Sequence, residues 1–121
     1  MVTRQTARRG TTQRVFRAIA EPTRRRLLDE LARGPRAAGA LARRFPSSRP
    51  AVARHLRVLR QAGLVRARRK GRLQIYELTP APLEGVRSWV DRYRDFWNER
   101  MDELTRYVEG LEEDGGERSE S

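Results

Sequence analysis

Apolar residues recur at helical spacing through the first half of the chain. On this basis we predict three short amphipathic helices, over residues 12–20, 22–32 and 36–45. The second has the clearest boundaries, because Pro22 suits the first position of a helix and a Gly-Pro pair follows its last turn. Residues 1–11 are polar, basic and without a period, so we expect them to form a disordered arm.

The next stretch, SRPAVARHLRVLRQAGL, predicts a fourth helix with two contrasting faces. Val52, Leu56 and Leu59 fall on one side at helical spacing, whereas the opposite side is rich in arginine. Ser48 can cap the start of this helix, and Gly63 suits the left-handed conformation that ends many helices. Together with the short helix before it, this is a helix-turn-helix pattern.

After this helix the hydrophobic period changes from about 3.6 residues to about two, which predicts a β-hairpin. Its strands are expected near residues 64–68 and 73–78, with a glycine-containing turn over residues 69–72. Tyr76 and Leu78 share one face of the second strand. We expect this face to pack on the helices.

From Pro80 onward, apolar residues again alternate in steps of three and four. Residues 83–111 as one helix would be about 43 Å long, too long for a body of about 70 residues to cover. Part of the apolar face should therefore meet a second chain and form a homodimer. The residues expected at this interface are Val86, Trp89, Val90, Tyr93, Phe96, Trp97 and Leu104. A small-molecule pocket between subunits, lined by the aromatic residues, is the alternative that the sequence leaves open.

Charge is segregated along the chain. Residues 1–78 hold 21 Lys+Arg against 4 Asp+Glu, a net charge of +17, whereas residues 79–121 hold 6 against 12, a net charge of −6. Codon bias can explain the preference for arginine over lysine, but not this separation of sign. A basic body with an acidic C-terminal part indicates a polyanionic partner for the body alone. Residues 112–121 are expected to be a disordered acidic tail.

Several classes of protein are disfavoured by composition. No apolar run approaches the length of a membrane span, and the N-terminus lacks the apolar core of a secretory signal. The absence of cysteine removes disulfides, thiolate ligands and thiol nucleophiles together. One histidine, no phosphate-binding glycine loop and no recognisable carboxylate pair argue against an enzyme. We therefore expect a cytoplasmic, non-enzymatic protein.

The order of elements predicts a mainly α fold with a small β-hairpin. Residues 12–79 would form a winged helix-turn-helix DNA-binding domain, and residues 80–111 a C-terminal dimerisation helix. The stretches AEPTRRRLLDEL, SRPAVARHLRVLRQAGLV and GRLQIYEL resemble ArsR-type transcriptional regulators in order and spacing. The resemblance covers about residues 13–100. It implies a homodimer that binds double-stranded DNA at an operator and usually represses transcription until a signal releases it.

In such regulators the helix corresponding to residues 48–61 enters the major groove and the wing lies along the DNA backbone. The recognition-helix residues expected to reach DNA are Ser48, Arg49, Pro50, Ala53, Arg54, His55, Arg57 and Arg60. Arg49 and Arg54 lie near the helix N-terminus and are candidates for reading bases, whereas Arg57 and Arg60 are candidates for holding phosphates. The expected wing contacts are Arg68, Arg69, Lys70 and Arg72.

Two residues of the recognition helix have more than one interpretation. His55 lies at the edge of the apolar stripe, where packing or a backbone contact is favoured over a DNA contact, and a metal ligand is the weakest reading. Ala53 stands where family members often have serine. Its methyl group could contact a thymine methyl, so an operator sequence cannot be transferred from relatives.

The helices that bind metal in metal-sensing relatives have a different composition here. Those relatives place cysteines on the first helix of the helix-turn-helix, or His and Asp/Glu pairs on the last helix. Here there is no cysteine, and residues 79–121 contain no histidine. The carboxylates at helical spacing on the last helix are Asp91, Asp95, Glu99, Asp102 and Glu103. An exposed acidic face is favoured over a hard-cation site. The resemblance is therefore to the metal-independent branch, with no cofactor, and an unknown small-molecule effector stays open.

Two functions compete at this point. The first is a sequence-specific, homodimeric transcriptional repressor. The second is an architectural or RNA-binding protein that uses the same charge without base selectivity. Both predict binding that weakens steeply with salt, so salt dependence cannot separate them. The combination of wing, recognition helix and dimer helix favours the first, because together they define the spacing of two half-sites.

Overall fold

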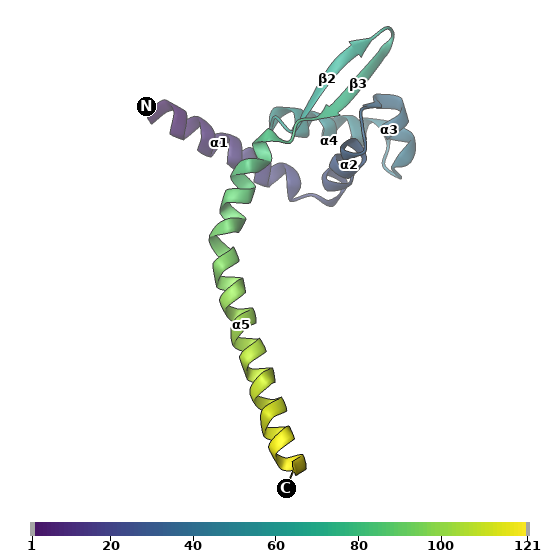
Figure 1. Ribbon diagram of the computed structural model, residues 1–121. Coiled ribbons are helices and arrows are strands. Elements are labelled where there is room, and N and C mark those ends of the chain that lie inside the picture. Colours follow the sequence, from purple (N-terminus) through teal and green to yellow (C-terminus); the bar gives the residue numbers. More distant parts are fainter. Residues whose placement is uncertain (1, 121) are drawn as a thin grey trace. The chain divides into compact units, whose positions relative to one another are not determined.

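The computed structural model describes the backbone of residues 2–120 and the side chains of residues 10–113. The chain divides into two compact units, Met1–Val86 and Arg87–Ser121. The elements in chain order are α1 (Val2–Ile19), α2 (Pro22–Ala32), β1 (Arg36–Ala37), α3 (Ala38–Arg44), α4 (Arg49–Gln61), β2 (Val65–Lys70), β3 (Leu73–Leu78), the 3-10 helix η1 (Ala81–Leu83) and α5 (Glu84–Glu120) (Figure 1). No helix among the described residues combines the length and apolarity needed to cross a membrane.

The first unit is built around one apolar core to which α1 to α4, β2 and β3 all contribute. Its buried residues are Val15, Ala18, Leu27, Leu31, Leu41, Val52, Leu56, Leu59, Ala62, Leu64, Val65 and Tyr76. The predicted apolar faces of the first four helices are therefore confirmed. Removing this hydrocarbon surface from water is the main force that holds the short helices together.

The start of α2 follows the sequence prediction. The Glu21 carboxylate accepts a hydrogen bond of 2.8 Å from the backbone N–H of Arg24, and Pro22 occupies the first turn. At the other end, the N–H of Gly34 donates to the carbonyl of Leu31, and the positive φ of Gly34 turns the chain away from the helix. The cap and the turn thus set the length of α2.

The sheet has three strands in the order β1-β3-β2, and both pairings are antiparallel. The hairpin was predicted, but its turn is shorter than expected. β2 extends to Lys70, which pairs with Leu73, so the loop consists of Gly71 and Arg72 alone. Gly71 has a φ of +61° and Arg72 does not have a positive φ, which matches a type II′ turn. The turn is shorter than predicted because cross-strand pairing continues to Lys70 and Leu73, the residues on either side of the loop.

Strand β1 was not predicted. Residues 36–45 were expected to be entirely helical, but Arg36 and Ala37 pair with Tyr76 and Ile75 of β3, and the helix begins at Ala38. Pairing with the free edge of β3 satisfies backbone groups that the first turn of a helix would leave without partners. Two residues are too few for a period to be visible in sequence.

Both end helices extend into segments that were expected to be disordered. Helix α1 starts at Val2, within the expected arm over residues 1–11, and α5 continues to Glu120, within the expected acidic tail over residues 112–121. Residues 1 and 121 lie outside the described part. Extending an existing helix costs much less than nucleating one, and neither segment contains the proline that would stop it.

The start of α5 belongs to the first unit. A Cβ atom added to Gly85 would collide with the side chain of Thr12, so glycine is what permits α1 and the first turn of α5 to approach so closely. Val86 is partly buried and packs against the core of the first unit. Part of the Val86 side chain is therefore already covered within the first unit, whose boundary falls after Val86.

Candidate nucleic-acid interface

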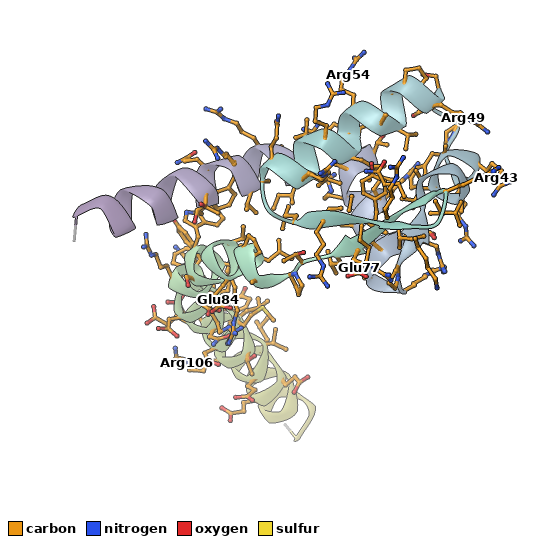
Figure 2. All side chains as sticks on the ribbon, turned by 90° about the horizontal axis from the view of Figure 1, so that it is seen from above. Arg43, Arg49, Arg54, Glu77, Glu84 and Arg106 are labelled. Carbon is orange, nitrogen blue, oxygen red and sulfur yellow. The ribbon has the colours of Figure 1, made fainter. Side chains whose placement is uncertain are left out.

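Helix α4 presents its basic face to solvent. Val52, Leu56 and Leu59 are buried in the core, whereas the expected DNA-contacting arginines of this helix are all exposed. Figure 2 shows Arg49 and Arg54 projecting outward from α4. The amphipathic pattern therefore orients the helix: burial of one side leaves the arginine side facing outward.

Hydrogen bonds define both ends of α4. Ser48 Oγ accepts a hydrogen bond of 3.3 Å from the N–H of Ala51, as predicted for a cap. At the C-terminus, the N–H of Leu64 donates to the carbonyl of Leu59 and that of Gly63 to the carbonyl of Arg60, with a φ of +77° at Gly63. This is a Schellman motif. The exposed N-terminus also carries the positive end of the helix dipole, which favours nearby phosphate.

The exposed arginines of α4 have free donors. Arg49, Arg54, Arg57 and Arg60 form no ion pair or side-chain hydrogen bond with any residue in the described part of the chain. A guanidinium without an internal partner can offer its full planar fork to guanine or phosphate. Ser48, Pro50 and Ala53 are exposed beside them.

His55 faces the turn between α1 and α2 instead of solvent. Its side chain is 21% exposed, and its Nδ1 lies 3.8 Å from Glu21 Oε2 and 3.4 Å from Arg24 Nη1. Arg24 in turn donates to the carbonyls of Ala18 and Arg17 at the end of α1. The surroundings therefore favour a packing role for His55. No group of three His, Asp or Glu side chains suited to a metal occurs among the described residues.

A groove lies between α3 and the N-terminal half of α4. Its volume is about 240 Å³. It is lined by Ala38, Gly39, Ala42, Arg49, Val52, Ala53, Leu56 and Tyr76. Sequence reasoning identified Ala53 and Arg49 but not the groove, because α3 and β3 complete it from distant parts of the chain.

The wing is the hairpin formed by β2 and β3. The arginines at its base form ion pairs, whereas the cations at its tip form none with other described residues. Arg66 and Arg68 both bind the carboxylate of Glu77, Arg66 with Nε at 2.9 Å and Nη2 at 2.8 Å, and Arg68 through its Nε. Register places Arg66 directly opposite Glu77 on the outer face of the hairpin. Figure 2 shows Glu77 on the opposite side of the hairpin from Arg54. Arg66 was missed by sequence reasoning, since the pairing emerges only once the register is known.

The other cations expected in the wing do not form ion pairs with Glu77. Arg69, Lys70 and Arg72 are exposed, and none forms an ion pair with another described residue. Arg69 and Lys70 end β2, and Arg72 lies in the turn. These three cations, and not Arg68, therefore make up the free charge at the tip of the wing.

Two carboxylates of the first unit have lowered pKa values. Hydrogen bonds from Arg66 and Arg68 hold the pKa of Glu77 below its ordinary value of 4.5, against the opposing effect of partial burial. For Glu21, desolvation raises the pKa, but hydrogen bonds from the backbone of Arg24 and Thr23 and the nearby His55 outweigh it. Both groups therefore favour their ionised form in the folded protein.

These shifts predict a loss of stability in acid. A carboxyl group with a lowered folded pKa stabilises the fold above its unfolded value and loses that contribution as pH falls through the folded value. We therefore expect the melting temperature to fall as the pH drops below about 4.5, and to fall less steeply in the Glu77→Gln variant. Thermal denaturation followed by circular dichroism between pH 7 and pH 3 would measure this.

Glu99→Gln is the matched control, because Glu99 is exposed and has no ion pair within the described side chains. It should follow the wild-type pH profile. If Glu77→Gln also follows the wild-type profile, the ion pairs at the base of the wing do not contribute to stability.

The second unit carries an exposed apolar face along α5. Its large side chains are each about half exposed or more: Trp89, Val90, Tyr93, Phe96, Trp97, Met101, Leu104, Tyr107, Val108 and Leu111. The rings of Trp89 and Tyr93 are tilted by 58° to each other with centroids 5.2 Å apart, and Arg100 lies over the ring of Phe96 at 5.1 Å. The cation–π contact places the Arg100 guanidinium group against an aromatic ring of this face.

A shallow groove of about 480 Å³ follows this face and is lined by Trp89, Val90, Tyr93, Arg94, Trp97 and Asn98. Six of the seven residues expected at a dimer interface lie on this exposed part of α5, and Val86 is the exception. A contiguous apolar surface of this kind is typical of a protein–protein interface.

Comparison with known proteins agrees with this geometry. Residues 19–68 match the family described as "Helix-turn-helix domain". HTH-type transcriptional regulator Rv2034 of Mycobacterium tuberculosis is 42% identical over 102 residues, which cover 84% of this chain and 90% of that protein. Transcriptional repressor SdpR of Bacillus subtilis is 40% identical over 76 residues, covering 63% of this chain and 84% of SdpR.

Solved structures show the same fold. The ArsR-like transcriptional regulator from Rhodococcus sp. RHA1 superposes with a TM-score of 0.63 and 33% identity, covering 80% of this chain and 92% of that one. The homodimeric winged helix-turn-helix DNA-binding domain Mb0332 from Mycobacterium bovis, a possible ArsR-family regulator, superposes with a TM-score of 0.62 and 31% identity, covering 80% and 90%.

Proposed function

Because the chain belongs to the ArsR family of winged helix-turn-helix transcriptional regulators, we propose that it is a homodimeric repressor that binds a pseudo-palindromic operator. The observation that carries this proposal is the row of arginines on the exposed face of α4, which form no ion pair with any side chain that the structure describes. A helix fits the major groove, where base edges differ, and arginine can bond both O6 and N7 of guanine. The protein would act by occupying DNA and not by catalysis.

The arginines of α4 would act at different depths. Arg49 and Arg54 lie in the first half of the helix and would reach base edges, whereas Arg57 and Arg60 lie further along and would hold phosphates. The unpaired wing cations Arg69, Lys70 and Arg72 would add backbone contacts. Arg68 is a weaker candidate, because a phosphate would have to compete with Glu77 for its guanidinium group.

The second chain would pack on the exposed aromatic face of α5. Support comes from the apolar side chains about half exposed along that helix, and from the similarity to the homodimeric Mb0332 domain. Two-fold symmetry would then present two recognition helices to half-sites about 34–36 Å apart. In this proposal the groove beside Trp97 is part of the protein interface and not the site of an effector.

The signal that would release the repressor is proposed to be independent of thiolate-bound metal. The chain contains no cysteine, so the sulfur ligands that hold soft metals are missing. A carboxylate-only site on α5 would suit hard cations, and its acidic residues are better explained as a solvated face with ion pairs such as Arg94–Asp91 at 3.3 Å.

Competition binding tests the main proposal. Fragments of the native genome are selected on the full chain in the presence of excess random DNA, and the recovered sites are sequenced. Enrichment of a common, approximately two-fold symmetric site is expected. Recovery of unrelated fragments would favour the alternative, a nucleic-acid-binding protein without sequence preference, because charge alone binds every sequence.

Substitution of Arg54 should separate base reading from charge. Arg54→Ala is expected to weaken operator binding by about 1–3 kcal/mol and to relax preference at one or two base pairs, since a bidentate contact to guanine would be lost. Fluorescence anisotropy with the operator and with single-base variants would measure both effects.

Lys70→Ala is the comparison variant, because it also removes one unpaired cation but from the wing. It should weaken binding to all sequences similarly and reduce the slope of log K against log salt by about one per wing. An equal loss on operator and random DNA for Arg54→Ala would instead identify Arg54 as a phosphate contact.

A further inference from the structure

The groove between α3 and α4 is apolar and opens beside the proposed base-reading residues. Val52, Leu56 and Tyr76 are buried residues of the core that also reach the groove. Ala38, Gly39 and Ala42 of α3 line one side, while Ala53 and Arg49 of α4 line the other. Apart from the Arg49 guanidinium and the Tyr76 hydroxyl, the lining side chains offer only hydrocarbon or none at all.

The geometry of α4 places an apolar and a cationic group next to each other. Arg49 and Ala53 are four residues apart and therefore lie on the same face, one turn from each other. Ala53 is exposed, and the Arg49 guanidinium has no partner among the described residues. A ligand that fills this site should combine a small hydrocarbon group with a neighbouring pair of hydrogen-bond acceptors.

In the major groove one base supplies the hydrocarbon group. Thymine carries a C5-methyl group there, where cytosine has only a hydrogen atom and the purines have no methyl group, and guanine presents the two acceptors O6 and N7. We propose that the groove between α3 and α4 receives the C5-methyl group of an operator thymine, while Arg49 binds the guanine of a neighbouring base pair. This inference rests on the proposed function and specifies which base pairs the recognition helix reads.

The polar edges of other bases suit the groove poorly. The N4 amino group of cytosine and the N6 amino group of adenine would lose water without gaining an acceptor from Ala38, Ala42 or Ala53. A methyl group, in contrast, loses nothing by leaving water. Thymine would therefore be distinguished from the other bases by shape and desolvation in the groove, and guanine at the neighbouring base pair by its hydrogen bonds to Arg49.

Deoxyuridine tests the methyl contact directly, because it pairs like thymidine and lacks only the methyl group. Each thymidine of the selected operator is replaced in turn, and affinity for the full chain is measured by fluorescence anisotropy. At one symmetric pair of positions, the loss is expected to be about threefold to fivefold per half-site. At the remaining positions the affinity should not change.

A substitution that fills the groove provides a second test of the methyl contact. Gly39 lines the groove, and a Cβ atom added there would meet no atom within 4 Å, so Gly39→Leu should fold normally and add a large apolar side chain at the α3 edge of the groove. This variant should bind the thymidine operator about threefold to fivefold more weakly and no longer distinguish it from the deoxyuridine operator. Its melting temperature reports separately on folding.

Gly10→Leu is the matched control, because Gly10 is also helical, is exposed and has nothing within 4 Å of the added Cβ atom. It should retain the wild-type preference for thymidine. The inference is overturned if no deoxyuridine position weakens binding, if the operator has no thymine facing α4, or if Gly39→Leu still prefers thymidine. Absence of any preferred operator would instead overturn the proposed function.

Discussion

Replacing Trp97 with glutamate is expected to convert the proposed homodimer into monomers. Trp97 is 64% exposed in the single chain and lies in the middle of the aromatic face of α5. Large aromatic side chains dominate the energy of protein interfaces, and a carboxylate in their place would have to be desolvated without a partner. The dimer should therefore weaken by roughly 2–4 kcal/mol, about 30-fold to 1,000-fold in its dissociation constant.

Sedimentation velocity across a concentration series would measure this change. Operator affinity should fall with it, because two linked half-sites bind far more tightly than one. Asp95→Lys is a suitable control, since Asp95 is exposed two residues away and so points to the opposite side of the helix. If Trp97→Glu remains a dimer, the interface lies elsewhere on the chain.

Truncation of Leu59 should have the largest effect on folding. Leu59 is 0% exposed and anchors the recognition helix in the core of the first unit. Leu59→Ala leaves a cavity and is expected to cost about 2–5 kcal/mol, a large fraction of the roughly 5–15 kcal/mol that stabilises a typical domain. The melting temperature should drop by roughly 10 °C or more. Circular dichroism melting curves would measure the loss.

The control for this experiment is a leucine of the same size in a different environment. Leu73 is 55% exposed at the tip of the hairpin, so Leu73→Ala should change stability by less than about 0.5 kcal/mol. An equally small change for Leu59→Ala would mean that the core can collapse around the missing side chain. At temperatures where Leu59→Ala stays folded, its operator affinity should be close to that of the wild type.

The basic surface of the first unit consists of parts with different roles. The unpaired arginines of α4 are directed outward by burial of Val52, Leu56 and Leu59 on its other side. At the base of the wing, by contrast, Arg66 and Arg68 share the carboxylate of Glu77. Net charge alone would count all these cations equally, although an internal ion pair reduces what a cation can offer to DNA.

Local patterns were sufficient to predict the helices and their orientation. The apolar spacing within residues 22–32, the cap at Ser48 and the glycine at Gly63 each correspond to what the structure contains. These local patterns predict the helices because a helix is stabilised by contacts within about four residues, and because one face of the helix is buried. The winged helix-turn-helix fold followed from their order.

Features that depend on distant residues could not be predicted in the same way. Strand β1 exists because β3 offers an edge, and its two residues have no period of their own. The partners of Arg68 and His55 lie 9 and 34 positions away, on elements whose register and packing are set by the whole fold. The groove beside Ala53 likewise needs α3, α4 and β3 together.

The four helices of the first unit, the β-hairpin, the family resemblance and the basic side of α4 could thus be predicted from sequence alone. Those properties arise from side-chain period and capping, which act over a few residues. The folded arrangement was needed to establish which arginines lack a partner among the described residues, which way His55 faces, and that an apolar groove lies beside Arg49. Charge pairing and cavities depend on distances between side chains that approach each other only after the chain has folded.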